Sequence, residues 1–278
     1  MLDKMKYVNS RGQVIEFGKK PFFINYSEIR KYAWNYDLHR NYNRIARFNR
    51  GLTEKRLPVV IAADNAEACT VAKNQLHDVI NYDIAKKAKG KLYVGEHYIE
   101  GYFIAAEPSS YLESPYVARI DLTFCAEKSV WVKEIVTEFI RKTDSVADID
   151  SKSPPYAYPY DYLMENTSRT NIENTTTTDA PIAIVINGYA ENPSIRIGQN
   201  LYELEVTVGQ GEYLIIDGLN KEAKLYDLTG NSASVFGYRN KLHDLFAKVP
   251  EGNNAVSWSG SFEFTITLYE ERSEPKWI

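Results

Sequence analysis

Carboxylate side chains are the most abundant candidates for chemistry in the second half of the sequence. Two carboxylates that face each other across a cleft can hydrolyse a glycosidic bond, one acting as the acid and the other as the base or nucleophile. The candidates are Glu203, Glu205, Glu212, Asp217, Glu263, Glu270 and Glu271. Glu203, Glu205 and Glu263 alternate with apolar residues, as in a β-strand with one solvent-exposed face. We therefore expect surface carboxylates rather than a glycosidase pair.

Histidines and cysteines offer the other routes to catalysis or metal binding. They are His39, His77, His97, His243, Cys69 and Cys125. No two of them have the spacing of metal ligands, and no local pattern supports a Cys–His nucleophile. The sequence also lacks a dinucleotide-binding glycine loop, a Gly-x-Ser-x-Gly motif and a phosphate-binding lysine loop. It therefore predicts no enzyme, no metal and no cofactor, and both cysteines are expected to be free, buried thiols.

The sequence between residues 30 and 56 is both basic and aromatic. The basic residues are Arg30, Lys31, Arg40, Arg44, Arg47, Arg50, Lys55 and Arg56, and the aromatic ones are Tyr32, Trp34, Tyr36, Tyr42 and Phe48. This combination is found on nucleic-acid-binding surfaces. However, Tyr32, Trp34 and Tyr36 share one face of an extended strand, so we expect them in a core. A protein-contact face is the favoured interpretation, ordinary exposed charge is the alternative, and no specific nucleic-acid binding is expected.

The first half of the chain is expected to be a β domain with one principal helix, spanning residues 1–141. A hairpin is predicted over residues 7–17, and a second one over residues 31–48 has its tip at residues 39–43. Asp64 or Asn65 can cap a helix that keeps helical spacing to about Ile84. Further strands are expected at 57–62, 91–94, 98–105 and 118–124.

Residues 142–278 are expected to form an antiparallel β-sandwich. Strands are predicted at 181–187, 201–208, 212–217 and 223–228, separated by turn signals. In the last strand Phe262, Phe264, Ile266 and Leu268 alternate with polar residues and should be buried together. Trp258 is expected to join this core, although an exposed Trp258 or Tyr269 would suit sugar stacking. The Pro- and Tyr-rich stretch 151–162 is expected to lie over a sheet.

Composition and charge agree with a folded protein in which residues 1–90 differ in charge from the remainder. Of 278 residues 44% are hydrophobic, and no apolar run approaches the length of a membrane span. No signal peptide is visible, which with the free thiols predicts synthesis in a reducing cytoplasm. Residues 1–90 hold 17 Lys and Arg against 9 Asp and Glu, a net +8, whereas the remainder has −12. This asymmetry suits a charge-complementary contact.

Short motifs lie at residues 211–217 (GEYLIID), 249–253 (VPEGN) and 271–277 (ERSEPKW), and further ones at 43–48, 90–94 and 130–132. In sequence they resemble the distal tail proteins (Dit family) of long-tailed bacteriophages. Their order and spacing support the resemblance, which covers most of the chain. The resemblance implies two domains, of which the second is a galectin-like β-sandwich.

The resemblance also implies a structural function in the virion tail tip. Family members form a hexameric ring that joins the tail tube to the tail-associated lysin or tip fibre and leaves a channel for DNA. Receptor-binding proteins are further partners of such hubs, and no membrane contact is implied. We expect the subunit contact at Arg40, Tyr42, Arg44, Arg47 and Arg50. The alternatives from other classes are a carbohydrate-binding β-sandwich module and a glycoside hydrolase.

Overall fold

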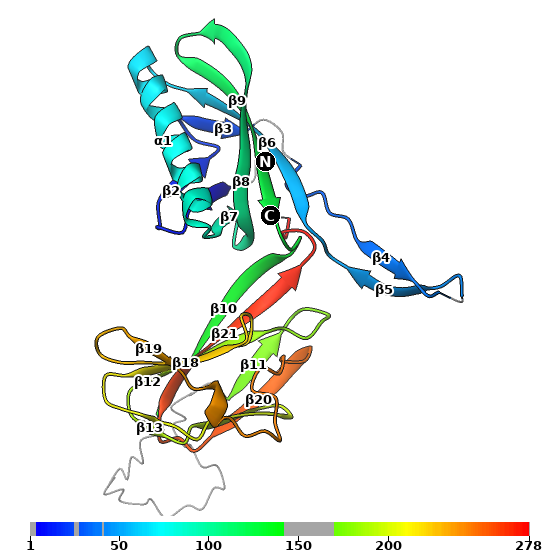
Figure 1. Cartoon of the computed structure of the whole chain (residues 1–278), viewed down its shortest axis with the longest axis vertical. Helices are drawn as coiled ribbons and strands as arrows, with labels where there is room; N and C mark the ends of the chain where they lie inside the picture. The colour runs from blue at the N-terminus through cyan, green and yellow to red at the C-terminus, as the bar shows by residue number, and fades with distance from the viewer. Residues whose placement is uncertain (1–3, 25–27, 41, 142–169, 278) are drawn as a thin grey trace, which may run out of the picture. The chain divides into compact units, whose positions relative to one another are not determined.

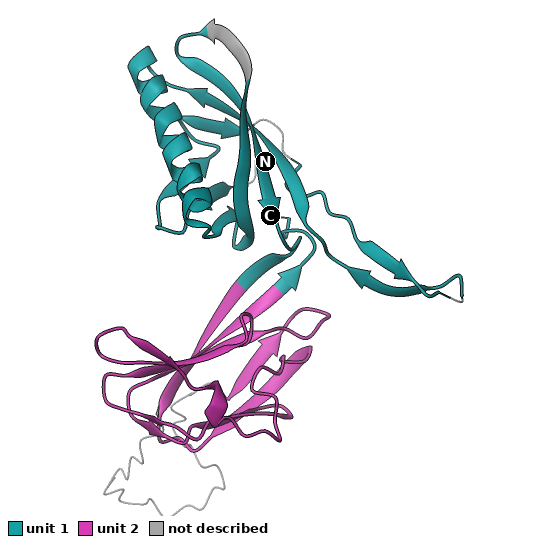
Figure 2. Cartoon of the chain, in the orientation of Figure 1, with its two compact units in different colours: residues 1–133, 271–278 teal, residues 134–270 magenta. Residues whose placement is uncertain are grey.

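The computed structural model describes residues 4–24, 28–40, 42–141 and 170–277, with the backbone only for residues 109–113. The chain divides into two compact units, coloured separately in Figure 2. Unit 1 comprises residues 1–133 and 271–278, and unit 2 comprises residues 134–270. The chain enters unit 2 along strand β10 (Trp131–Phe139) and leaves it along β21 (Glu263–Arg272). The stretch 151–162, expected to lie over a sheet, falls outside the described residues.

In its described residues, unit 1 contains an antiparallel sheet, helix α1 and a separate two-stranded hairpin (Figure 1). The strands of the sheet pair in the order β2, β1, β7, β8, β9, β6 and β3. Their bounds are β1 Met5–Val8, β2 Val14–Phe17, β3 Phe22–Ile24, β6 Thr53–Ala62, β7 Gly90–Val94, β8 His97–Ser114 and β9 Val117–Ala126. The predicted hairpin over residues 7–17 is confirmed by the pairing of β1 with β2.

Strand β8 is much longer than predicted because it changes partner along its length. Residues 97–101 pair with β7, and the pairing with β9 begins at Tyr102. Gly101 lies at this change, and a side chain there would collide with the carbonyl oxygen of Cys125 on β9. A glycine is therefore required for the close approach of the two backbones.

Helix α1 (Ala66–Lys86) packs on this sheet, against β8, β6 and β2. The side chain of Asn65 accepts a hydrogen bond of 2.7 Å from the backbone nitrogen of Ala68, which confirms the predicted cap. The helix buries a stripe at helical spacing, formed by Cys69, Ala72, Leu76, Val79, Ile80 and Asp83. The buried Asp83 accepts hydrogen bonds from the Tyr7 hydroxyl and from Ser10, which ties the helix to the first hairpin.

The described residues of unit 2 form two main antiparallel sheets. One has the order β19, β18, β17, β12, β21 and β10, and the other β11, β20, β14 and β15; a short pair joins β13 to β16. The bounds are β11 Asn171–Asn174, β12 Ile182–Asn187, β13 Ala190–Glu191, β14 Ser194–Ile197, β15 Asn200–Glu203, β16 Thr207–Val208, β17 Tyr213–Asp217, β18 Glu222–Tyr226, β19 Ser232–Ser234 and β20 Gly252–Trp258. A short 3-10 helix, η1, covers Phe236–Tyr238.

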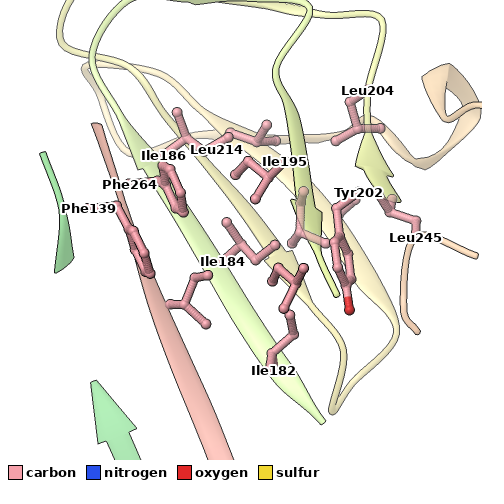
Figure 3. Close-up of a cluster of buried hydrophobic side chains, with 14 of the residues drawn as sticks. Phe139, Ile182, Ile184, Ile186, Ile195, Tyr202, Leu204, Leu214, Leu245 and Phe264 are labelled. Carbon is pink, nitrogen blue, oxygen red and sulfur yellow. The ribbon is translucent and has the colours of Figure 1, made fainter. Parts of the chain in front are cut away.

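The core of unit 2 lies between strands of both sheets (Figure 3). Ile184 on β12 and Phe264 on β21 pack in one cluster with Ile195 on β14 and Tyr202 on β15. The predicted burial of Phe262, Phe264, Ile266 and Leu268 is confirmed, since each is at most 2% exposed. The mainly β fold with a helix in the first domain is therefore confirmed.

One predicted strand is interrupted in the structure. Residues 201–208 were expected to form a continuous strand, but β15 ends at Glu203 and β16 covers only Thr207–Val208. Leu204 instead makes an isolated bridge with Arg239, and Glu205 donates its backbone hydrogen to Tyr238. Tyr202, Leu204 and Val208, which occupy alternate positions in this stretch, are nevertheless buried, because a strand pattern specifies burial but not a continuous partner.

Candidate functional site

The basic and aromatic stretch forms a two-stranded hairpin that projects from the rest of unit 1 (Figure 1). We call residues 32–49 the arm. Strand β4 (Asn35–Leu38) pairs with β5 (Ile45–Asn49), with a register shift at Asp37 and Leu38. At the tip the backbone nitrogen of His39 donates a 2.9 Å hydrogen bond to the carbonyl of Arg44. The predicted hairpin is present, with its tip at the predicted position.

The aromatic residues of the arm are exposed, so their predicted place in a core is wrong. Tyr32, Trp34 and Tyr36 are 51%, 42% and 58% exposed. The other large apolar side chains of the arm are also exposed: Leu38, Tyr42, Ile45 and Phe48. Trp34 and Phe48 contact each other edge to face, with ring centroids 6.3 Å apart. Strand β4 begins only at Asn35, so Tyr32 and Trp34 precede it, and no second sheet covers these side chains within the described part of the chain.

The five predicted contact residues have different environments along the arm. Arg40, Tyr42 and Arg44 lie at the exposed tip, where Arg40 and Tyr42 help to line an open hollow. Arg47 is held by Asp37 of the facing strand, with nitrogen–oxygen distances of 3.0 and 2.8 Å. Arg50 lies at the root of the arm, by which we mean residues 28–31 and 50–56 at its base. Arg50 is partly buried, and its burial lowers its pKa. The tip residues are thus the ones available to a partner.

Lys55, which the sequence analysis placed among the basic residues of a protein-contact face, is buried at the root of the arm. Lys55 on β6 is 1% exposed, and its Nζ donates a 2.5 Å hydrogen bond to the carbonyl of Lys31. Burial lowers the pKa of Lys55 to about 8, and the charge of Glu28 partly opposes this. A signal was present in the sequence, since Lys55 occupies the same strand face as Leu57 and Val59.

Several carboxylates of unit 2 that were considered for catalysis hold turns or loops. Glu203 accepts a 2.9 Å hydrogen bond from Asn240, and Glu212 accepts one of 2.8 Å from the backbone of Gly209. Asp217 organises the turn that follows β17 by accepting from the backbone nitrogens of Leu219 and Asn220. These carboxylates have local structural roles, so no catalytic role is needed to explain their positions.

Trp258 is not a free platform for stacking a sugar. Its indole nitrogen donates a 3.0 Å hydrogen bond to the carbonyl of Phe262, and its ring lies edge-on to Phe139 and Phe264. The residue is half-buried against the core, in agreement with the prediction. Cys69 and Cys125 are both free; Cys69 is buried as expected, whereas Cys125 is only half-buried.

The described residues contain neither a metal-binding group nor a membrane-spanning helix. Among residues 4–24, 28–40, 42–141 and 170–277, no group of three His, Cys, Asp or Glu side chains could hold a metal ion. Within these ranges no helix has both the length and the apolar character needed to cross a bilayer.

Comparison with solved structures finds the same fold in phage proteins. The chain is similar to the Dit protein of phage SPP1, described as a hub of the adsorption apparatus in phages of Gram-positive bacteria, with a TM-score of 0.58 and 10% identity. That match covers 98% of this chain and 100% of the other. A chain of the phage P2 baseplate, in its activated conformation with calcium, matches with a TM-score of 0.62, 11% identity and coverage of 99% and 100%.

The similarity is one of structure and not of sequence. The strontium form of the same P2 baseplate gives a TM-score of 0.61 at 11% identity. No family model and no curated protein matches the sequence. Because each structural match extends over nearly the whole of both chains, it includes both units and their order. The resemblance to the distal tail family is therefore confirmed at the level of the fold: this chain has the fold of phage Dit and baseplate hub proteins.

Proposed function

We propose that the protein is a structural hub of a phage tail tip, with no catalytic activity. The observation that carries this proposal is the whole-chain fold match to the SPP1 Dit protein and the P2 baseplate chain. In this proposal unit 1 forms the ring domain and unit 2 forms the galectin-like domain. The protein would be made in the host cytoplasm and reside in the virion tail.

The proposed assembly is a homohexameric ring in which the arm of each subunit contacts the next. An isolated two-stranded hairpin is at best marginally stable in water, and this one exposes seven large apolar side chains. A contiguous apolar surface of this kind is typical of protein contacts. We assign the covering partner to a second copy of this chain. A head-to-tail contact between identical subunits closes into a ring when its rotation allows closure.

Charge supports the same assignment. The exposed arginines at the tip, Arg40 and Arg44, belong to residues 1–90, which have a net charge of +8, whereas the remainder of the chain carries −12. Arginine can form paired hydrogen bonds with a carboxylate, which gives such a contact orientation as well as attraction. Other faces of the ring would bind the tail tube protein and the tail-associated lysin or tip protein. A receptor-binding protein is a further partner.

The proposed contact is tested by reversing charge at the arm tip. The Arg40→Glu, Arg44→Glu double variant should shift the sedimenting species from hexamer toward monomer while its circular dichroism stays unchanged. The matched control is Arg196→Glu, Lys241→Glu, which makes the same charge change at exposed positions of unit 2. A hexamer that survives the tip variant would place the subunit contact elsewhere. Dissociation of both variants alike would indicate a general charge effect rather than a contact at the tip.

A further inference from the structure

The two ends of the arm are held by the same short segment of the chain. Arg30 precedes the arm and Arg50 follows it, and both side chains reach the segment Ser273–Trp277, which comes directly after β21. All of these residues belong to unit 1. We refer to Ser273–Trp277 as the latch segment.

At the start of the arm, Arg30 contacts the latch segment through two different interactions. Its Nη1 donates a 2.7 Å hydrogen bond to the carbonyl of Pro275. Its guanidinium also lies over the indole of Trp277, 3.8 Å from the ring centre, which is within the range of a cation–π contact. Trp277 is otherwise 71% exposed, so this arginine accounts for the position of a large side chain at the surface.

On the other side, Arg50 links the latch segment to the aromatic residues of the arm. Its Nη2 donates to the Ser273 hydroxyl at 3.3 Å, and its guanidinium lies 4.3 Å from the centre of the Trp34 ring. Trp34 in turn contacts Phe48 on the opposite strand. Contacts therefore continue from Ser273 through Arg50 to the first aromatic pair of the arm.

We propose that the latch segment clamps the root of the arm and fixes the direction in which the arm leaves unit 1. Each contact is modest because Trp277 is largely exposed and the Arg50–Ser273 bond is long. Two attachments at opposite ends of the arm nevertheless restrain both of its strands, which a single contact would not do. The direction of the arm decides whether it can contact the next subunit. The latch segment is therefore a positioning element for the proposed contact between subunits.

The latch is independent of ring formation, because all its contacts lie within one chain. It predicts slow hydrogen exchange at the root, where the backbone nitrogen of Glu28 donates to Arg56 and that of Lys31 donates to Glu28. Loss of the latch should loosen these amides and leave the rest of the fold protected. The control amides are those of β7 (Gly90–Val94), which pair on both sides within the sheet.

The test is hydrogen–deuterium exchange on the full chain carrying Ser273→Ala and Trp277→Ala. We expect exchange in the peptide that covers residues 28–34 to become roughly tenfold faster, with β7 unchanged. Lys276→Gln is the matched control, since it alters the same segment without touching Arg30 or Arg50, and it should exchange as the parent does. Trp277→Phe keeps an aromatic ring for Arg30 and should restore most of the protection.

Unchanged exchange at residues 28–34 in the double variant would overturn the proposal, and so would an equal acceleration in Lys276→Gln. If the double variant also loosens β7, the single Trp277→Ala variant replaces it; acceleration in β7 as large as at the root would then refute a local clamp. A protein that never forms a ring can still give the expected exchange result. The two proposals can therefore fail separately.

Discussion

Substitution by alanine at two phenylalanines distinguishes a residue of the folding core from a residue of the proposed subunit contact. Phe264 on β21 is 2% exposed and stacks on Phe139 with ring centroids 4.7 Å apart. Phe48 on β5 is 58% exposed. Truncating a fully buried phenylalanine typically costs about 3–5 kcal/mol, because buried area is lost and a cavity remains. We therefore expect Phe264→Ala to reduce the free energy of unfolding of unit 2 by about that amount.

Phe48→Ala should behave in the opposite way. An exposed side chain away from a packed core changes the stability of the folded subunit by about 0.5 kcal/mol or less. In the proposed ring, however, Phe48 would become buried against the next subunit. Burying a whole phenylalanine is worth roughly 1.5–3 kcal/mol, so burying its exposed half should contribute about 1 kcal/mol to each contact. The variant should keep its stability and lose affinity between subunits.

Urea unfolding followed by circular dichroism measures the stability, and sedimentation velocity over a concentration series measures the assembly. Unfolding is compared at concentrations where the parent and the variant are in the same oligomeric state, because assembly itself adds stability. A stability loss below about 1 kcal/mol for Phe264→Ala would refute the assigned core. An unfolding loss for Phe48→Ala as large as that for Phe264→Ala would refute the description of the arm as an unpartnered surface.

Three further predictions concern pH, salt and catalysis. The pKa of Lys55 is about 8 in the folded chain, whereas an unfolded lysine titrates near 10.4. Between these pH values the unfolded chain binds more protons than the folded chain. The free energy of unfolding should therefore rise from about pH 8 to pH 10, by at most about 3 kcal/mol. Lys55→Met should lose this rise in urea titrations kept below pH 10, above which the raised pKa of Tyr7 acts in the opposite direction; an unaltered slope would mean that Lys55 is not the group responsible. If the arm-tip arginines dominate the subunit contact, the ring should weaken between low and high salt in sedimentation runs, since exposed pairs are screened over roughly 8 Å at physiological ionic strength; an unchanged ring would assign the contact to apolar area. The purified protein should release no reducing sugar from peptidoglycan or host polysaccharide, and activity that disappears on changing Glu263 or Asp217 would contradict the structural role.

The sequence predicts those elements whose partners are close in the chain or whose pattern is long. The helix carried a cap at Asn65 and a buried stripe, and β21 alternated over a long run, so both are found where expected. The hairpin arm was predicted for the same reason, because its strands are adjacent. Its aromatic residues were wrongly assigned to a core, since period-2 alternation defines a face without showing whether another layer covers it.

Contacts between distant segments were beyond the reach of pattern reasoning. Arg30 and Pro275 are 245 residues apart, and Arg50 and Ser273 are 223 apart, so no local periodicity relates them. The burial of Lys55 could have been inferred from its strand face, but its hydrogen bond to Lys31 depends on how the root of the arm folds back. The candidate contact residues were found by composition, whereas their separation into tip, paired and root positions required the structure.

The measurement that tests the central claim most directly is the mass of the purified wild-type chain in solution. Sedimentation equilibrium or native mass spectrometry over a range of concentration and salt gives this mass without any substitution. The hub proposal predicts a species of six times the chain mass at low salt and high concentration, in equilibrium with monomer on dilution. A monomer at every concentration and salt tested would contradict it.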